Sequence, residues 1–129
     1  MGVKERKERE KELRRDEILK TGEKLFIEKG FAYTTMEEIA RECELAKGTL
    51  YLYFKSKEEL LSEIMYRALT LQYEMMFSYQ DGITDPIERM RMIGEAHFDF
   101  YKKYPDHFRL MTDIHMPGKF HPDATDEKH

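Results

Sequence analysis

The 129-residue chain has almost none of the features from which disulfide frameworks and membrane spans are built. It contains one cysteine, so neither an intrachain disulfide nor a cysteine-ligated metal site can form within a single copy. No apolar run approaches the roughly 18 residues that a membrane-spanning helix needs. The charged N-terminus lacks the apolar core of a signal peptide. We therefore expect a protein of the reducing cytoplasm that does not bind a membrane.

The chain also lacks a recognisable catalytic constellation, with no nucleophile–base pair and no glycine loop that could cradle a phosphate. His97 and His107 are ten residues apart, which is not a metal-ligand spacing. An enzyme could use only the cluster of His97, Asp99 and Tyr101, and helical spacing spreads these three around a helix. Cys43 lies in an apolar pattern and is predicted to be a buried small side chain. We expect no enzyme activity, no cofactor and no metal.

Charge is abundant, at 37% of the residues, but it is unevenly distributed. The formal net charge of −4 argues against a nucleic-acid partner. Residues 1–15, however, carry a net charge of +3, whereas residues 81–129 carry −3. A basic end and an acidic end are typical of a protein that places only one end on DNA, although a solvated charged terminus explains the same run.

Residues 34–57 are the most informative stretch. Thr35 and Glu38 have the spacing of a capping box and predict the start of a short helix. Apolar residues then recur at helical spacing on one face, namely Met36, Ile39, Ala40 and Cys43.

The pattern is interrupted at residues 44–46, and a second short helix is predicted from Lys47. Leu50 and Phe54 form its narrow inner face. A helix of about two turns is not stable alone, because nucleation is costly. It must therefore pack on its neighbours, and its outer surface is available to a partner.

The outer residues of this second helix suit DNA. Lysine reaches phosphates and guanine edges, and threonine offers a hydroxyl and a methyl group. Gly48 lacks a side chain that would hold a partner away, although glycine in a helix costs about 1 kcal/mol relative to alanine. Tyrosine hydroxyls contact phosphates. Each residue also has an ordinary interpretation: Tyr51 and Tyr53 as half-buried packing residues, Lys47 and Lys57 as a solvated face.

The combined strings are more specific than any single residue. The chain reads T-T-M-E-E-I-A and then K-G-T-L-Y-L-Y-F-K-S-K-E-E-L-L, preceded by I-L-K-T-G-E-K-L-F-I-E-K-G-F. Over residues 16–65 this resembles the DNA-binding domain of the TetR family of bacterial transcriptional regulators. The resemblance implies an all-α protein: a three-helix helix-turn-helix domain followed by a helical regulatory domain that dimerises and binds a small effector.

The predicted organisation has four parts: a charged N-terminal arm at residues 1–14, the helix-turn-helix domain at 15–57, a partial regulatory and dimerisation region at 58–118, and a disordered tail at 119–129. By position, the resemblance implies that Thr35 touches phosphate and that Tyr51, Tyr53 and Lys57 hold the DNA backbone. It implies that base edges are faced by Lys47, Gly48, Thr49 and Leu52. Family members often carry a basic arm that reaches DNA; here residues 1–14 either fray or extend the first helix as a charged rod.

Two positions depart from the family pattern. Glu44 stands in the turn where glycine is usual, and a left-handed conformation there would cost about 1 kcal/mol. Ala46 replaces the usual serine or threonine, so it cannot cap the next helix, which typically costs about 1 kcal/mol. Both changes bear on affinity more than on fold.

Four further helices are predicted, at about residues 16–29, 57–79, 86–103 and 106–115, with Pro117-Gly118 ending the last. Capping boxes at Ser56 and Asp85 mark two of the starts. In the third of these helices, a stripe at helical spacing is formed by Ile87, Met90, Ile93, Gly94, His97, Phe98 and Tyr101. Methionines and aromatics could line an adaptable effector pocket, or they could simply be core; the methionines are Met65, Met75, Met76, Met90, Met92 and Met111.

The resemblance favours a cytoplasmic, nucleoid-associated regulator of a bacterium or archaeon. We expect a repressor that binds a palindromic double-stranded operator as a homodimer and is released by a small apolar effector. Members of the family typically continue for several more helices, so the chain resembles one cut short: a fragment, a truncated product or a natural short form. The alternative is a truncated helical interaction module that sequesters a longer partner without binding DNA.

Overall fold

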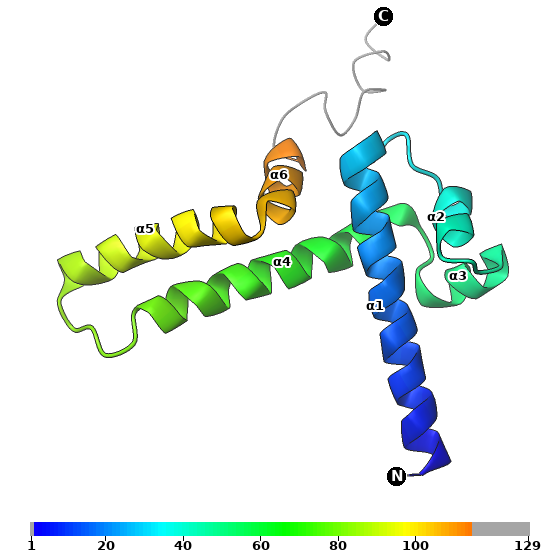
Figure 1. The fold of residues 1–129 in the computed structure, drawn as a ribbon, viewed down its shortest axis with the longest axis horizontal. Coiled ribbons are helices and arrows are strands. Elements are labelled where there is room, and N and C mark those ends of the chain that lie inside the picture. Colours follow the sequence, from blue (N-terminus) through cyan, green and yellow to red (C-terminus); the bar gives the residue numbers. More distant parts are fainter. Residues whose placement is uncertain (1, 115–129) are drawn as a thin grey trace, which may run out of the picture. The chain divides into compact units, whose positions relative to one another are not determined.

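The computed structural model describes residues 2–114, and this part of the chain contains six α-helices and no β-strand (Figure 1). The predicted all-α fold class is confirmed. The described residues form two compact units, residues 2–64 and residues 65–114, and α4 contributes to both. The predicted helix stop at Pro117-Gly118 and the tail at 119–129 lie outside the described residues. The helices are α1 (Val3–Lys29), α2 (Met36–Glu42), α3 (Lys47–Tyr53), α4 (Lys57–Tyr79), α5 (Pro86–Lys103) and α6 (Pro105–Ile114).

Helix α1 begins at Val3, much earlier than the predicted start near Asp16. Of the two alternatives for residues 1–14, the structure therefore has the charged rod. These residues are nearly all lysine, arginine and glutamate, which are strong helix formers. Opposite charges also stand four residues apart, as at Glu10 and Arg14, which adds a small stabilisation. The predicted inner stripe is confirmed as buried: Ile18, Leu19, Gly22, Leu25 and Phe26.

Side-chain caps define three of the helix starts as predicted. In each case the backbone N–H three residues into the motif donates to the capping oxygen, which satisfies one of the free donors of the first turn. The donor–acceptor distances are 3.1 Å for Glu38 N to Thr35 Oγ1, 3.1 Å for Glu59 N to Ser56 Oγ and 3.3 Å for Glu88 N to Asp85 Oδ2.

The first unit closes its core around α1. The side chain of Leu60, at the start of α4, lies so close to Gly22 that a Cβ there would meet Leu60 Cδ2 at 2.4 Å. Phe26 and Phe31 pack edge to face, with ring centroids 5.0 Å apart. The fully buried hydroxyl of Thr34 donates to the carbonyl of Gly30 at 2.8 Å. The core of this unit is thus apolar and its buried polar group is satisfied.

The helical stripe of α5 that the sequence marks is mostly exposed. Ile87 is 75% exposed and Met90 73% exposed, and the further members Gly94, His97, Phe98 and Tyr101 are also exposed, whereas Ile93 is half-buried. The buried side chains of α5 are Ala96 and Phe100. The helix carries apolar residues on two sides, and Ala96, which is small enough for close approach, lies on the side that packs. Met90 therefore does not line an interior pocket.

Polar contacts join α4 to α5 within the second unit. The hydroxyl of Tyr79 donates to Asp99 Oδ2 at 2.6 Å, which is the main reason why the pKa of Tyr79 is raised. His97 Nδ1 lies 3.4 Å from the amide of Gln72. The ring of Tyr101 instead packs edge to face on Phe108 of α6. His97, Asp99 and Tyr101 thus have three separate partners and do not converge on one site.

Candidate nucleic-acid interface

Helix α3 has a buried side and an open side. Leu50 and the residue that ends the helix, Phe54, are fully buried, as the sequence predicts. On the opposite side Lys47, Gly48 and Leu52 are exposed, and Leu52 is 85% exposed although it is apolar. An exposed leucine alone needs no explanation. Here Leu52 lies beside Lys47 and Gly48 on a helix whose other side is anchored in the core by Leu50 and Phe54.

Gly48 adds a specific property to this open side. A Cβ placed on Gly48 would meet no atom within 4 Å, so packing in the chain does not require glycine there. The glycine leaves the backbone of the first turn of α3 accessible to a partner. Thr49 and Tyr53 flank the open side and are half-buried, and Tyr51 is exposed next to Lys47.

The turn between α2 and α3 is a Schellman motif with glutamate in the position usually occupied by glycine. Glu44 has φ 57°, the left-handed conformation that was predicted to be strained. The Glu44 N–H donates to Arg41 O at 3.1 Å and the Leu45 N–H donates to Ala40 O at 2.8 Å, the two bonds that define the motif. The motif ends α2 and directs the chain into α3.

Helix α3 begins without a side-chain cap. Ala46 occupies the capping position in an extended conformation and makes no side-chain hydrogen bond, as the sequence predicts. The first N–H groups of α3 are thus available to a ligand, since helix N-termini are frequent phosphate partners.

Lys47 is held by a residue that the sequence analysis missed. Its Nζ lies 2.5 Å from Oε1 of Glu37, in the first turn of α2, and 5.9 Å from the ring centroid of Tyr51. The hydrogen bond from Lys47 is the largest cause of the lowered pKa of Glu37, and the same bond raises the pKa of Lys47. Ten residues and a turn separate the partners, so only the folded turn brings them together.

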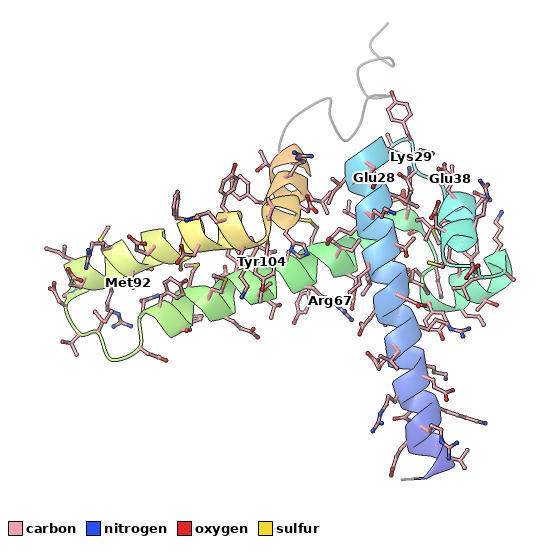
Figure 2. All side chains as sticks on the ribbon, in the orientation of Figure 1. Glu28, Lys29, Glu38, Arg67, Met92 and Tyr104 are labelled. Atoms are coloured by element: carbon pink, nitrogen blue, oxygen red, sulfur yellow. The ribbon has the colours of Figure 1, made fainter. Side chains whose placement is uncertain are left out.

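Thr35 is the N-cap residue of α2. Its hydroxyl accepts from the Glu38 N–H and donates to Glu38 Oε1 at 3.2 Å. Glu38 also forms an ion pair with Lys29 at the end of α1 (Figure 2). The hydrogen bond from Lys29 is the main cause of the lowered pKa of Glu38. The remaining lone pair of the exposed Thr35 oxygen can still meet a partner.

Arg15 is a second residue that the sequence analysis did not assign. Its guanidinium donates to the carbonyl of Tyr53 at 3.3 Å, lies 4.4 Å from the ring centroid of Phe54 and lies 3.6 Å from Glu63. Arg15 therefore connects α1, the end of α3 and the start of α4. A shallow hollow beside it is lined by Lys11, Glu12, Arg15, Leu52 and Tyr53.

Lys57 differs from the other predicted contacts. Its ammonium donates to the carbonyl of Phe31 at 2.7 Å and to that of Ala32 at 3.3 Å, and it lies 4.5 Å from the Phe31 ring centroid. The side chain is half-buried and joins the start of α4 to the α1–α2 connection. The structure does not bring it together with Lys47 and Gly48.

Cys43 is half-buried and not fully buried as predicted, because it follows the last turn of α2, where the surface begins. Burial is still the main cause of the raised pKa of its thiol.

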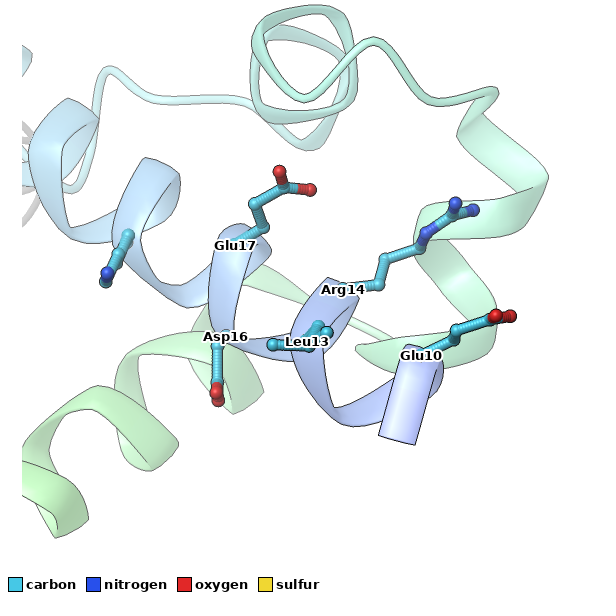
Figure 3. Close-up of a pocket in the computed structure, with 6 residues that line it drawn as sticks. Glu10, Leu13, Arg14, Asp16 and Glu17 are labelled. Carbon is cyan, nitrogen blue, oxygen red and sulfur yellow. The ribbon is translucent and has the colours of Figure 1, made fainter. Parts of the chain in front are cut away.

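A hollow on the opposite side of α1 is lined by residues of that helix alone (Figure 3). They are Glu10, Leu13, Arg14, Asp16, Glu17 and Lys20. The carboxylates do not converge, and within residues 2–114 no group of three or more His, Cys, Asp or Glu side chains is arranged to hold a metal ion. No helix in the described part of the chain is long and apolar enough to span a membrane.

This arrangement defines a class of protein. Helices α1, α2 and α3 are consecutive, a tight turn joins α2 to α3, and the outer side of α3 is exposed, which together make a helix-turn-helix unit. The sequence profile of the bacterial regulatory proteins of the tetR family matches residues 18–64. Residues 18–64 therefore carry the helix-turn-helix domain of the TetR family, and the relatives with which the chain aligns are HTH-type transcriptional regulators.

Two relatives extend the likeness beyond the matched domain. The HTH-type transcriptional regulator YerO of Bacillus subtilis is 34% identical over 76% of this chain. The HTH-type transcriptional repressor KstR2 of Mycolicibacterium smegmatis is 31% identical over 78% of this chain. The chain spans 35% of YerO and 53% of KstR2, so it corresponds to at most about half of either relative.

A solved structure of a TetR-like transcriptional regulator from Rhodococcus sp. RHA1 has a TM-score of 0.71 at 26% identity. The likeness covers 89% of this chain and 63% of that one. It supports the helix-turn-helix unit followed by further helices.

Proposed function

We propose that the chain is a sequence-specific double-stranded DNA-binding transcriptional regulator, a cytoplasmic repressor released by a small effector. The observation that carries this proposal is the open side of α3, where Lys47, Gly48 and Leu52 are exposed while Leu50 and Phe54 hold the helix from behind. A helix with this exposure fits a major groove, which is about 12 Å wide.

In this proposal Lys47, Gly48, Thr49 and Leu52 face base edges. Thr35 and the uncapped N-terminus of α3 contact phosphate, and the hydroxyls of the flanking side chains Tyr51 and Tyr53 add backbone contacts. Lys57 has one N–H left after its two carbonyl bonds, so its phosphate contact is the weakest of the set.

Dimerisation and an effector belong to the same proposal. Two-fold operators are read by two-fold dimers with half-sites one helical turn apart, so a homodimer on a palindromic operator is the expected form. An apolar effector in the helical second unit would change the spacing of the two α3 helices and release the DNA.

Helix α1 supplies a further part of the DNA surface. Lys4, Lys7, Lys11 and Arg15 recur at helical spacing on the side of α1 whose shallow hollow is shared with Leu52 and Tyr53 of α3. We expect this stripe to contact phosphates as a rigid helix.

The stripe is tested with the triple variant Lys4→Gln, Lys7→Gln, Lys11→Gln. Losing three phosphate contacts should make the slope of log affinity against log salt shallower by about 2.7. The matched control removes Arg6, Arg9 and Lys20, the same charge on the other side of α1. Equal slopes for the two triple variants would rule out the stripe.

The α3 assignment is tested by Gly48→Ala with Gly94→Ala as the matched control. Both glycines are exposed, and a Cβ on either meets no atom within 4 Å, so neither change should unfold the chain. Gly48→Ala places a methyl group between α3 and the groove and should weaken binding to a selected duplex at least about tenfold, whereas Gly94→Ala should not. Unaltered binding by Gly48→Ala would remove α3 from the interface.

A second candidate function has its own observation. Large apolar side chains are exposed on α4 (Tyr66, Tyr73 and Phe77) and on α5 (Ile87, Met90 and Phe98). Tyr73 and Phe77 stack with their ring centroids 6.5 Å apart, and exposed apolar side chains that gather in this way are typical of a protein interface. The second candidate is therefore an interaction module that sequesters a longer partner. Selection of binding sites from a random duplex pool decides: an enriched palindrome supports the regulator, and no enrichment with formation of a complex with a longer paralogue supports the module.

A further inference from the structure

The ion pair between Glu37 and Lys47 places a carboxylate on the side of the unit that faces DNA in the proposed function. The side chains are about equally open to solvent, with 53% of Glu37 and 56% of Lys47 exposed. Exposed ion pairs of this kind contribute little to stability. A carboxylate in the first turn of α2 suits the positive end of the helix dipole, but this does not require that it pair with Lys47.

The carboxylate changes what Lys47 can recognise. A lone lysine is a mobile point charge that attracts any phosphate. With Glu37 Oε1 at 2.5 Å, the ammonium is locally neutralised and its direction is restrained, while two of its three N–H donors stay available. The pair therefore binds phosphate poorly and can still donate to a base.

The chemistry of the pair matches one kind of base pair. In the major groove a G·C pair presents the guanine O6 and N7 acceptors beside the cytosine N4 amino donor. Lys47 supplies donors for the guanine, and the second carboxylate oxygen of Glu37 supplies an acceptor for the cytosine. In an A·T pair the adenine N6 donor lies between the adenine N7 and thymine O4 acceptors, so the two remaining donors of Lys47 find no adjacent pair of acceptors there.

The neighbouring carboxylate shows that the placement of Glu37 is particular. Glu38 contacts Lys29 and the cap residue Thr35, so it is used in joining α1 to α2. Glu37 also interacts with its own backbone and with Thr35, but its largest interaction is with Lys47 of α3.

We propose that Glu37 is a specificity-determining residue, which with Lys47 reads one G·C base pair in each half-site and suppresses binding to non-operator DNA. This inference rests on the proposed function, because it needs α3 in the major groove.

The experiment compares the full chain with Glu37→Gln and Glu42→Gln in selection from a random duplex pool, followed by titration of operator and non-operator duplexes over a range of salt. Glu42 is an exposed carboxylate at the end of α2. Glu42→Gln therefore removes one negative charge, as Glu37→Gln does, but at a position that does not contact Lys47. The wild-type and Glu42→Gln chains should select a motif in which one position of each half-site is G·C. The Glu37→Gln chain should show no base preference at that position.

The expected loss of discrimination at that position is about tenfold or more. Glu37→Gln should also bind non-operator duplex more tightly, and its salt slope should steepen by about 0.9 because Lys47 gains a phosphate. In a Lys47→Gln background, Glu37→Gln should have no further effect on either quantity, since the two residues act as a unit. Thermal unfolding of the variants should match that of the wild type.

The inference is overturned if Glu37→Gln selects the wild-type motif with the wild-type salt slope, or if its effect persists without Lys47. Binding of a palindrome by the wild type in that case leaves the proposed function intact. Failure of the wild type to bind any duplex at low salt would overturn both.

Discussion

The two units of the molecule treat their apolar side chains differently. In residues 2–64, most large apolar residues of α1, α2 and α3 are buried, and the exposed ones lie at the N-terminal half of α1 (Val3 and Leu13) and on α3 (Tyr51 and Leu52). In residues 65–114, α4 and α5 leave aromatic and aliphatic side chains exposed along their lengths, among them Tyr73, Phe77 and Ile87. The first unit completes its own core, whereas the second unit would gain stability by burying these faces.

The largest expected effect contrasts a phenylalanine from each unit. Phe54→Ala removes a fully buried ring and should lower the free energy of unfolding by about 3–5 kcal/mol. Phe98 is 59% exposed, so Phe98→Ala should change it by less than about 0.5 kcal/mol. Urea denaturation followed by circular dichroism measures both. A large cost for Phe98→Ala would mean that the α5 face is covered in solution.

A smaller effect is expected at the contact between α1 and α4. Gly22→Ala brings a Cβ to 2.4 Å from Cδ2 of Leu60, which is fully buried and has little room to move. Overpacking of this kind costs about 1–3 kcal/mol, against which the better helix propensity of alanine returns at most about 1 kcal/mol. The melting temperature should fall for Gly22→Ala and hold or rise for the open Gly94→Ala. A rise for both would show that the α1–α4 packing is loose.

Each unit has a residue in the left-handed backbone conformation, and substitutions at these two residues should change the stability in opposite directions. Glu44 (φ 57°) in the α2–α3 turn and Gly82 (φ 75°) in the α4–α5 loop share the same kind of backbone conformation. Glu44→Gly should therefore stabilise the chain by about 1 kcal/mol, and Gly82→Ala should destabilise it by a similar amount. Chemical denaturation of the two variants tests the signs. Destabilisation by Glu44→Gly would show that the glutamate side chain makes a compensating contact.

The smallest effect concerns pH and belongs to the first unit. The pKa of Glu38 in the folded chain is lowered from 4.5, chiefly by the hydrogen bond from Lys29. Its stabilising contribution is therefore complete above pH 4.5 and is lost as the pH falls through the lowered value. Glu38→Gln should reduce the acid sensitivity of the melting temperature slightly. An unchanged pH profile would mean that the ion pair is fully screened in solution.

Local signals in the sequence predicted the first unit well. The capping boxes at Thr35 and Ser56, the inner pair Leu50 and Phe54 and the strained position Glu44 each depend on residues within one turn, so spacing alone is enough. The sequence left open whether residues 1–14 fray or extend α1, because helical stability in a charged run depends on many weak pairs and not on one cap.

What the sequence could not predict depends on tertiary packing. Helix α5 has apolar residues on two sides, and periodicity does not say that the side with Ala96 and Phe100 faces inward. The contacts of Glu37 with Lys47 and of Arg15 with Tyr53 join residues 10 and 38 positions apart. Neither pair has a spacing signature, since both form only after the turn and α4 are in place.

Arg15 has a consequence in mechanical terms. One guanidinium touches the carbonyl at the end of α3, the ring of Phe54 and the carboxylate of Glu63 in α4. A rotation of α4 about its own axis would displace Glu63. Because Arg15 contacts both Glu63 and the carbonyl of Tyr53, this displacement would also move the last turn of α3. We expect a rotation of α4 to be transmitted to α3 through the Arg15 side chain, while α1, which carries Arg15, stays in place.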